Sequence, residues 1–311
     1  MRLLRGFEEP AKWHDGFVAI GNFDGVHLGH QSMAASLTAR AQRESVPSVV
    51  LTFDPHPIRL LRPQHAPPSL STLDQKAELL GKQGVDFVIG YPTDEQLLEL
   101  SPEEFFRSVV IDKLRARGLV EGLNFYFGRD RAGNIDALAR YCSEYGLSLD
   151  IVPPVSVKDR MVSSSLIRSL IADGAMEHAA ELLGHPYRIS GTVGRGAGRG
   201  RTMGFPTANL EQIETLLPRD GVYAAVGHTE GRTWPAAVNC GANPTFGESH
   251  RKLEAHLIGM TESLYGERLL IDFVTRVRDT VVFSGPDELR DQLQRDIRQV
   301  EQLIGQLPNA D

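Results

Sequence analysis

The sequence predicts an α/β domain followed by an all-β domain that ends in a helix. Residues 1 to about 155 alternate short apolar runs with helical patterns, which is typical of an α/β sheet. After residue 186 the pattern changes to short strands separated by glycine and proline turns. The length of 311 residues allows about two domains, at roughly 150 residues each. We place the boundary where Gly184-His185-Pro186 breaks the pattern, so the predicted domains are residues 1–184 and 185–311.

The composition is typical of a globular protein with cores of useful size. Hydrophobic residues make up 41% and charged residues 23% of the chain. The formal net charge of −7 disfavours non-specific binding to nucleic acid, which requires a basic surface. Two cysteines cannot form a disulfide framework and are consistent with a reducing cytosol. Met1–Pro10 lacks the apolar core of a signal peptide, and no apolar run approaches membrane-spanning length. We therefore expect a cytoplasmic protein without nucleic-acid or membrane partners, either a monomer or a transient oligomer.

The first motif joins a strand to a helix. Phe17–Ile20 is an apolar run typical of a buried parallel strand, and Gly21 and Gly25 allow backbone conformations that a side chain would obstruct. A helical pattern starts at about residue 31, so His27 and His30 should lie at a helix N-terminus, which attracts anions. Two imidazoles could donate hydrogen bonds to a phosphate, which would favour their protonation. The alternatives are two surface histidines on a turn, or a metal pair, although neither cysteine is near.

The rest of this domain continues the alternation. Predicted strands cover residues 48–53, 85–89, 119–122 and 149–152, and predicted helices cover residues 72–83, 102–117, 134–145 and 165–183. Asp54 and His56 follow the first of these strands in a proline-bounded loop, and Asn124 follows the third. Ligands of open α/β sheets bind at the carboxyl ends of strands. The alternatives are a plain proline turn and an asparagine that bonds to its own backbone.

Three serines, Ser163, Ser164 and Ser165, stand at the start of the last predicted helix of this domain. A helix cap explains one of them. It does not require three serines with Arg168 one turn later. Hydroxyls, N–H groups and a guanidinium are suited to a triphosphate.

The string from Gly21 to His30, Gly-Asn-Phe-Asp-Gly-Val-His-Leu-Gly-His, resembles the ATP-binding signature of the nucleotidyltransferase superfamily. In full it is similar to the adenylyltransferase half of the bacterial bifunctional riboflavin kinase/FAD synthetases, which implies a Rossmann-like sheet. The resemblance implies charge stabilisation by His27 and His30. It implies that the loop with Phe53, Asp54 and His56 holds the flavin. It further implies ATP contacts from Gly21, Asn22, Phe23, Asp24, Gly29, Asn124, Ser163, Ser164, Ser165 and Arg168. Ser165 replaces a threonine of the family pattern and keeps the hydroxyl.

The second domain starts with a strand and a loop rich in glycine and arginine. Predicted strands cover residues 187–193, 221–227, 234–239, 253–258 and 270–277, which suggests a small antiparallel barrel or sandwich, and a helix over 285–304 should pack against it. The loop Gly194–Arg201 lacks the spacing of a dinucleotide-binding or P-loop motif. Its glycine N–H groups and arginines suit a polyphosphate. A basic tract that binds RNA or stays solvated is the alternative.

The following residues resemble the flavokinase motif. Thr207 and Asn209 offer neutral oxygens on one side of an extended segment, which suits Mg²⁺; a polar turn is the alternative. The order Gly-Arg-Gly-Arg, then Gly-Phe-Pro-Thr-Ala-Asn, is the pattern in which the family's Thr and Asn hold Mg-ATP. The resemblance implies a metal on Thr207 and Asn209. It also implies ATP contacts from Gly196, Gly198, Arg199, Gly200, Arg201, Thr207 and Asn209.

Glu254 lies in the alternating run 252–258, where a solvent-facing glutamate needs no function. In the family, the glutamate at this position takes the proton from the riboflavin 5′-hydroxyl, a task that suits a carboxylate. Residues 238–247 resemble the second signature of that family. The family usually has an acidic residue soon after the glutamate, where this chain has Gly259-Met260.

The resemblance covers both halves of the chain in order and implies an enzyme with two activities. It would phosphorylate riboflavin to FMN with Mg-ATP and would then adenylylate FMN to FAD, with release of pyrophosphate. Its partners would be small molecules. Two other classes remain: a nucleotidyltransferase with a non-catalytic barrel, and a flavin- or RNA-binding regulatory module.

Overall fold

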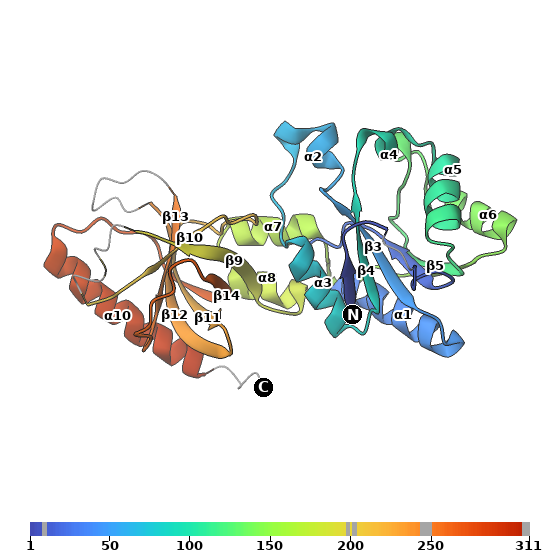
Figure 1. Cartoon of the computed structure of the whole chain (residues 1–311). Helices are drawn as coiled ribbons and strands as arrows, with labels where there is room; N and C mark the ends of the chain where they lie inside the picture. The colour runs from blue at the N-terminus through green and yellow to red at the C-terminus, as the bar shows by residue number, and fades with distance from the viewer. Residues whose placement is uncertain (8–10, 197–199, 201–203, 243–250, 307–311) are drawn as a thin grey trace. The chain divides into compact units, whose positions relative to one another are not determined.

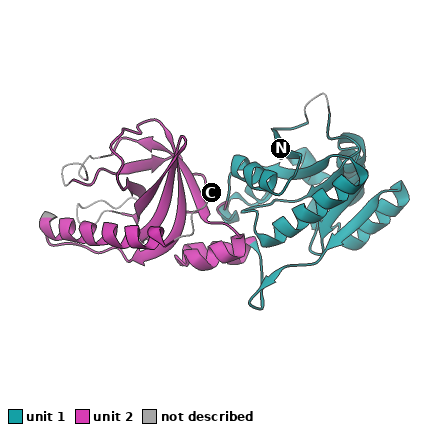
Figure 2. Ribbon diagram, turned by 90° about the horizontal axis from the view of Figure 1, so that it is seen from below, with its two compact units in different colours: residues 1–67, 71–163 teal, residues 68–70, 164–311 magenta. Residues whose placement is uncertain are grey.

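The computed structural model describes residues 1–7, 11–196, 200, 204–242 and 251–306. The chain forms two compact units (Figure 2). Unit 1 contains residues 1–67 and 71–163, and unit 2 contains residues 68–70 and 164–311. The compact units therefore divide about 20 residues before the break that the sequence pattern shows at residue 184, and the domain boundary at that position stays a prediction.

Unit 1 is built on a six-stranded parallel sheet with the order β1-β4-β3-β2-β5-β6 (Figure 1). The strands are β1 (Arg2–Leu4), β2 (Phe17–Ile20), β3 (Ser48–Asp54), β4 (Phe87–Pro92), β5 (Gly118–Gly122) and β6 (Ser148–Val152). The chain adds β3 and β4 on one side of β2 and then β5 and β6 on the other. This reversal creates a crevice at the carboxyl ends of β2 and β5, where ligands of such sheets bind.

Helices cover both faces of this sheet, so its central strand is buried on both sides. Phe17 and Ala19 of β2 pack with α1 (Leu28–Glu44) and α3 (Leu73–Lys82). Val18 and Ile20 point to the other face. There they pack with α5 (Pro102–Phe105), the π-helix η2 (Phe106–Lys113) and α6 (Ile135–Tyr145). The apolar run Phe17–Ile20 predicted a strand buried on both faces, and the two cores confirm it.

Unit 2 contains a closed antiparallel barrel with the strand order β10-β13-β12-β11-β14-β9. The strands are β9 (Tyr187–Gly194), β10 (Ala208–Glu211), β11 (Gly221–Thr229), β12 (Arg232–Gly241), β13 (Lys252–Leu257) and β14 (Arg268–Arg278). The helix α10 (Pro286–Gly305) packs on β11, β12 and β14 (Figure 1). A second helix, α8 (Met176–Leu183), packs on β9 and β14. The predicted barrel and terminal helix are confirmed.

Two expected helices were wrong in detail. The helix expected over 165–183 is two helices, α7 (Ser164–Ala172) and α8, because Gly174 adopts a left-handed φ of +79° between them. The helix expected over 102–117 changes after one α-turn into the π-helix η2, with hydrogen bonds such as Leu114 N–H to Val109 O. The spacing of apolar residues in the sequence does not distinguish an α-helix from a π-helix.

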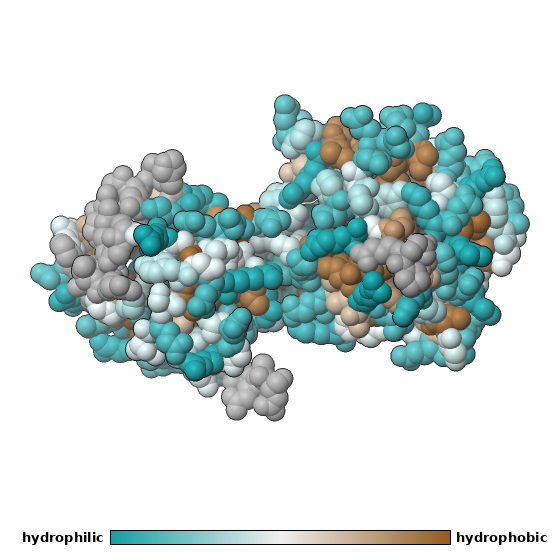
Figure 3. All heavy atoms as spheres, viewed as in Figure 1, coloured by the Kyte–Doolittle hydropathy of each residue, from teal (hydrophilic) through white to brown (hydrophobic). Residues whose placement is uncertain are grey.

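Short elements without apolar periodicity were not predicted. These are β1, α2 (Ile58–Leu61), α4 (Glu95–Glu99), the 3-10 turns η1 (Pro63–His65) and η3 (Arg129–Arg131), and the hairpin β7 (Ser156–Val157) and β8 (Arg160–Met161). The barrel strand β10 was expected only as an extended segment around Thr207 and Asn209. On the face shown in Figure 3, hydrophilic residues cover most of the described surface. None of the helices in the described ranges is long and apolar enough to cross a membrane.

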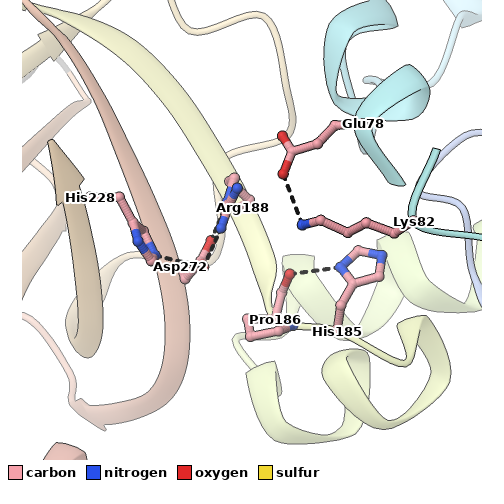
Figure 4. Close-up of polar contacts among 7 residues, drawn as sticks. All are labelled: Glu78, Lys82, His185, Pro186, Arg188, His228 and Asp272. Carbon is pink, nitrogen blue, oxygen red and sulfur yellow. Dashed lines mark hydrogen bonds and ion pairs between the residues drawn. The ribbon is translucent and has the colours of Figure 1, made fainter. Parts of the chain in front are cut away.

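A charged cluster joins three strands of the barrel (Figure 4). The Arg188 guanidinium on β9 donates to both carboxylate oxygens of Asp272 on β14, at 2.6 and 2.7 Å. His228 on β11 donates from Nε2 to the same carboxylate at 2.8 Å. Burial alone would raise the pKa of Asp272, but the hydrogen bonds from Arg188 and His228 outweigh it and the pKa is lowered. The cluster therefore stabilises the barrel while Asp272 is ionised.

We expect Asp272→Asn to weaken the barrel by on the order of 2 kcal/mol at pH 7, because one charge-assisted pair is lost. The folded pKa is below the unfolded value. The contribution of Asp272 is therefore present above the unfolded pKa and disappears as the pH falls through the folded pKa. The loss of barrel stability is measured by hydrogen exchange of the β9 and β14 amides. Asp291→Asn, at an exposed position of α10, is the control. Equal protection in both variants at pH 7 would show that the cluster does not contribute.

Candidate active sites

The segment between β2 and α1 has an unusual backbone. Phe23, Gly25 and Val26 have φ values of +46°, +78° and +39°. Such values are rare for residues with side chains, and for a β-branched valine they indicate strain. Phe23 and Val26 are fully buried in the core between the sheet and α1, which offsets this strain. The loop that the sequence identified is thus held in one conformation by its own apolar residues.

Ser71 fixes the polar side of the same loop. Its N–H and its hydroxyl both donate to Asp24 Oδ1, at 3.1 and 3.3 Å. Its hydroxyl oxygen accepts from Gly25 N–H at 2.8 Å. Asp24 and Ser71 are both buried. Asp24, expected as an ATP contact, therefore also holds the loop. The sequence offered no signal for Ser71, because its partners lie 46 and 47 positions away.

His27 and His30 lie at the N-terminus of α1, as predicted. His27 is the N-cap residue, and its Nδ1 accepts from His30 N–H at 3.3 Å. An accepting Nδ1 carries no proton, so the proton of this imidazole is on Nε2. The two rings stack with centroids 3.7 Å apart. A Cβ on Gly29 would lie 3.2 Å from the His27 ring, which explains a glycine between the histidines.

The environment of His30 keeps its imidazole neutral. Burial lowers the pKa of His30 well below its ordinary value, and the nearby His27 and Lys76 lower it further. Lys76 is a buried residue of α3 that the sequence analysis did not select. His30 Nδ1 and Asn22 Oδ1 are buried without a hydrogen-bond partner in the described part of the chain. Buried polar atoms without partners are rare, and a bound ligand is one way to satisfy them.

Glu121 lies in the crevice between β2 and β5, and sequence analysis missed it. The two strands pair only at Phe17 and Val18 of β2. Beyond this point the Glu121 carboxyl accepts from Ile20 N–H at 2.7 Å in place of a strand partner. Its side chain is 1% exposed. Burial raises the pKa of Glu121 well above its ordinary value, and the bond from Ile20 opposes this only in part, so the carboxyl keeps its proton.

The remaining expected contacts of unit 1 follow other strands of the sheet. Phe53 is half-buried against the core, and Asp54 ends β3 and is exposed. The Asp54–Pro55 peptide bond is cis. His56 Nδ1 accepts from Ile58 N–H at 3.1 Å, at the start of α2. Asn124 is exposed in the turn after β5. The parallel sheet thus places them all near the carboxyl ends of its strands.

The serine and arginine motif divides between the units. Ser163 is the last residue of unit 1, whereas Ser164, Ser165 and Arg168 belong to α7 in unit 2. Arg168 donates from Nε to Pro68 O at 2.9 Å, within unit 2.

In unit 2 the barrel register aligns the predicted kinase residues. Asn209 on β10 pairs with Glu254 on β13, and Glu254 pairs with Asn239 on β12. The buried residues of β13 are Leu253, Ala255 and Leu257, so Glu254 faces outward. Directly opposed residues share a face. Asn209 and Glu254, which are 45 positions apart in the sequence, are therefore neighbours on the outer face of the barrel.

The glycines of the glycine/arginine loop lie against the two residues expected to hold Mg-ATP. A Cβ on Gly196 would lie 2.1 Å from Asn209 Nδ2, so a larger residue there would displace the Asn209 side chain. A Cβ on Gly200 would lie 2.3 Å from Phe205 O and 3.4 Å from Thr207 Oγ1. Gly198, Arg199 and Arg201 lie outside the described residues.

A pocket opens beside Thr207. Its lining includes the apolar side chains of Leu257, Met260 and Leu264, together with Tyr265. The backbone here is fixed by His256, whose Nδ1 donates to Pro206 O at 2.8 Å. Within the residues that the structure describes, no group of three His, Cys, Asp or Glu is arranged to hold a metal ion. The sequence analysis had selected Thr207 but not the apolar residues beside it.

Comparisons with known proteins match both halves of the chain. Residues 9–166 match the family model of FAD synthetase, and residues 183–304 match that of riboflavin kinase. The bifunctional riboflavin kinase/FMN adenylyltransferase of Pseudomonas fluorescens is 36% identical over 299 residues, covering 96% of each chain. Its counterpart from Escherichia coli K12 is 33% identical over 309 residues, covering 98% of each. The crystal structure of a macrolide-efflux protein from Streptococcus pneumoniae has a TM-score of 0.85 and 30% identity, covering 96% of this chain and 98% of that one.

Replacing Glu121 tests the buried neutral carboxyl. Above the unfolded pKa of about 4.3 the unfolded chain ionises while the folded chain keeps its proton, so Glu121 lowers stability as the pH rises toward its folded pKa. Glu121→Gln keeps the acceptor for Ile20 and cannot ionise. We expect it to raise the unfolding temperature of unit 1 at pH 7.5 by about 2–4 °C, a gain on the order of 1 kcal/mol.

The gain from Glu121→Gln should vanish toward pH 4, where both states of the natural chain are protonated. The exposed Glu103→Gln on α5 is the matched control and should change little at either pH. A gain that does not depend on pH, or a loss at pH 7.5, would show that the Glu121 carboxyl is ionised in the folded protein.

Proposed function

The chain belongs to the family of bifunctional riboflavin kinase/FMN adenylyltransferases, and we propose how its residues divide the two reactions. It phosphorylates riboflavin to FMN with ATP and transfers AMP from a second ATP to FMN, which gives FAD. The assignment of one reaction to each half rests on one observation. Each family model matches one half of the chain, and each half has its own motifs on its own helices and strands. We do not transfer the efflux activity named for the Streptococcus pneumoniae protein, because both family models and the full-length relatives name flavin transferases.

We propose that Glu254 is the base of the kinase reaction. The 5′-hydroxyl of riboflavin must lose a proton when its oxygen attacks the γ-phosphate of ATP. Glu254 faces outward beside Asn209, so a carboxylate lies next to a residue expected to hold Mg-ATP. The proton passes to the carboxylate, the new O–P bond forms, and ADP leaves. The apolar pocket beside Thr207 would take the adenine of this ATP.

Thr207 and Asn209 are the residues that would hold Mg²⁺. They offer a hydroxyl and an amide oxygen, and Mg²⁺ commonly takes few protein ligands and completes its shell with water and phosphate oxygens. A Cβ on Gly196 would displace the Asn209 side chain, and a Cβ on Gly200 would clash with Phe205 O beside Thr207. This close approach supports a loop that brings its N–H groups to the phosphates of the nucleotide. The bound ion would neutralise charge on those phosphates.

We propose that the adenylyltransferase reaction depends on the loop of residues 21–30. The FMN phosphate is already ionised, so it can attack the α-phosphate without a general base, and pyrophosphate leaves. The buried atoms Asn22 Oδ1 and His30 Nδ1 are available to a nucleotide. The neutral His30 acts as a hydrogen-bond donor, and the charge of a triphosphate opposes the lowering of its pKa. Ser164, Ser165 and Arg168 would stabilise the leaving group, and Phe53, Asp54 and His56 would hold the flavin.

The cytoplasmic location, the monomeric or transient oligomeric state and the lack of nucleic-acid and membrane partners stay predictions. The match of residues 183–304 to riboflavin kinase favours a catalytic barrel over the non-catalytic barrel that the sequence left open.

Separating the two activities by mutation tests this division. We expect the natural chain, with riboflavin, ATP and Mg²⁺, to form FMN and then FAD, as followed by chromatography. His30→Ala should lower FAD formation at least about tenfold and leave FMN formation unchanged. Glu254→Gln should lower FMN formation at least about a hundredfold and leave FAD formation from supplied FMN unchanged. Equal loss of both activities in either variant would contradict two separate sites. FMN formation that persists with excess chelator would contradict a role of Mg²⁺.

Ser71→Ala tests whether the loop must be braced. The variant loses the two hydrogen bonds of the hydroxyl, one to Asp24 and one from Gly25, and keeps the backbone N–H bond to Asp24. We expect about a tenfold lower rate of FAD formation from FMN and unchanged FMN formation. Ser143→Ala, at an exposed position of α6, is the control. If both alanine variants form FAD at the natural rate, the brace has no part in catalysis.

A further inference from the structure

The outer face of the barrel carries a row of three polar side chains. Asn209 on β10 and Asn239 on β12 both lie directly opposite Glu254 on the strand between them. Residues in this relation have Cβ atoms about 4.5–5.5 Å apart and point to the same side of the sheet. The proposed base therefore has an amide side chain on each side. Sequence analysis gave Asn209 a role but gave none to Asn239.

Asn239 has no place in the barrel core. Its neighbours along β12, Val238 and Cys240, are fully buried inside the barrel. Asn239 itself is half-buried on the opposite side of the strand. The next residue on that side, Ala237, lies opposite His256 and is small. The position of Asn239 thus contributes a polar group beside Glu254 rather than apolar contacts to the fold.

An amide at this position supplies what a carboxylate base requires. The base must accept a proton from one direction, so its carboxylate has to be held in one orientation. Hydrogen bonds donated to a carboxylate also favour its ionised form. The amide of Asn209 is packed against Gly196 and is assigned to Mg-ATP, whereas the amide of Asn239 lies on the other side of Glu254. Lys252 and His256 on β13, and Glu211 on β10, are the titratable groups on this face near Glu254 among the described residues.

We infer that Asn239 is a positioning residue of the kinase reaction, whose amide donates to the Glu254 carboxylate and keeps it directed at the 5′-hydroxyl of riboflavin. The inference rests on the proposed role of Glu254 as the base. It predicts that Asn239 affects the rate of phosphate transfer and the pH dependence of that rate, and not the binding of either substrate.

The test uses the full chain and counts FMN plus FAD as the product of riboflavin. Asn239→Ala should lower kcat about tenfold and change the KM for riboflavin and for ATP less than about threefold. Asn239→Asp places a second carboxylate beside Glu254, so the acid limb of the kcat–pH profile should move up by about one pH unit. Thr233→Ala, at an exposed position of β12, is the control and should leave the profile unchanged. FAD formation from supplied FMN should be unchanged in all variants, which would show that the substitutions have not unfolded the protein.

The possible outcomes distinguish a failure of the inference about Asn239 from a failure of the proposal that Glu254 is the base. If Glu254→Gln abolishes FMN formation while the Asn239 variants behave like Thr233→Ala, Asn239 has no positioning role. A higher KM for riboflavin with unchanged kcat in Asn239→Ala would assign the amide to substrate binding, which also overturns the inference. If Glu254→Gln retains kinase activity, the base has been misassigned and the inference falls with it.

Discussion

The geometry of unit 1 depends on how strand β2 ends. Along β3 its ladder continues through Gly21 N–H to Leu51 O, at 3.0 Å, whereas β5 separates from it after two pairs. The backbone N–H of Ile20 would be buried without a partner, and Glu121 supplies the acceptor. At the end of β2, the hydrogen-bond acceptor on the β5 side is thus the Glu121 side chain and not a backbone carbonyl. The space beyond it is where the loop of residues 21–27 turns toward the helix with the two histidines.

The geometry of the proposed site in unit 2 depends on the pairing register of the barrel strands. A closed barrel has no edge along which a strand can slip, so the residue opposite Glu254 is fixed on both sides. A shift of one position would turn Glu254 into the barrel interior and replace it with an apolar neighbour. The proposed catalytic arrangement is thus a consequence of the fold, because strand pairing alone brings Asn209 and Glu254 together.

The sequence predicted those features that local patterns determine. Short apolar runs predicted five of the six strands of the sheet, and short strands between glycine and proline turns predicted five of the six strands of the barrel. The helical pattern after residue 31 placed His27 and His30 at a helix start. The single helix expected over 165–183 was wrong because the sequence does not show whether a glycine such as Gly174 continues a helix or ends it. The left-handed φ of Gly174 ends the first helix. Ser71 and Glu121 could not be selected, since each bonds to residues far away in sequence. Asn239 lies in the run 238–247 that resembles a family signature, but its place beside Glu254 follows only from the barrel register. The roles given to them stay predictions, as do those given to the motif residues.

The two reactions differ in what must happen to a proton, and this accounts for the different residue types. Riboflavin offers a neutral hydroxyl, so the barrel needs an acceptor, and the Glu254 carboxylate on its outer face, between two asparagines, suits that proposed task. FMN offers a phosphate that is already ionised, so an acceptor would serve no purpose in the loop after β2. A carboxylate there would repel both phosphates. Burial and the neighbouring His27 and Lys76 instead keep His30 neutral until an anion arrives. Asp24, the acidic residue within that loop, accepts two hydrogen bonds from Ser71, and burial raises the pKa of Glu121. The proposed triphosphate site therefore lies near one carboxylate that is hydrogen-bonded and one whose neutral form is favoured.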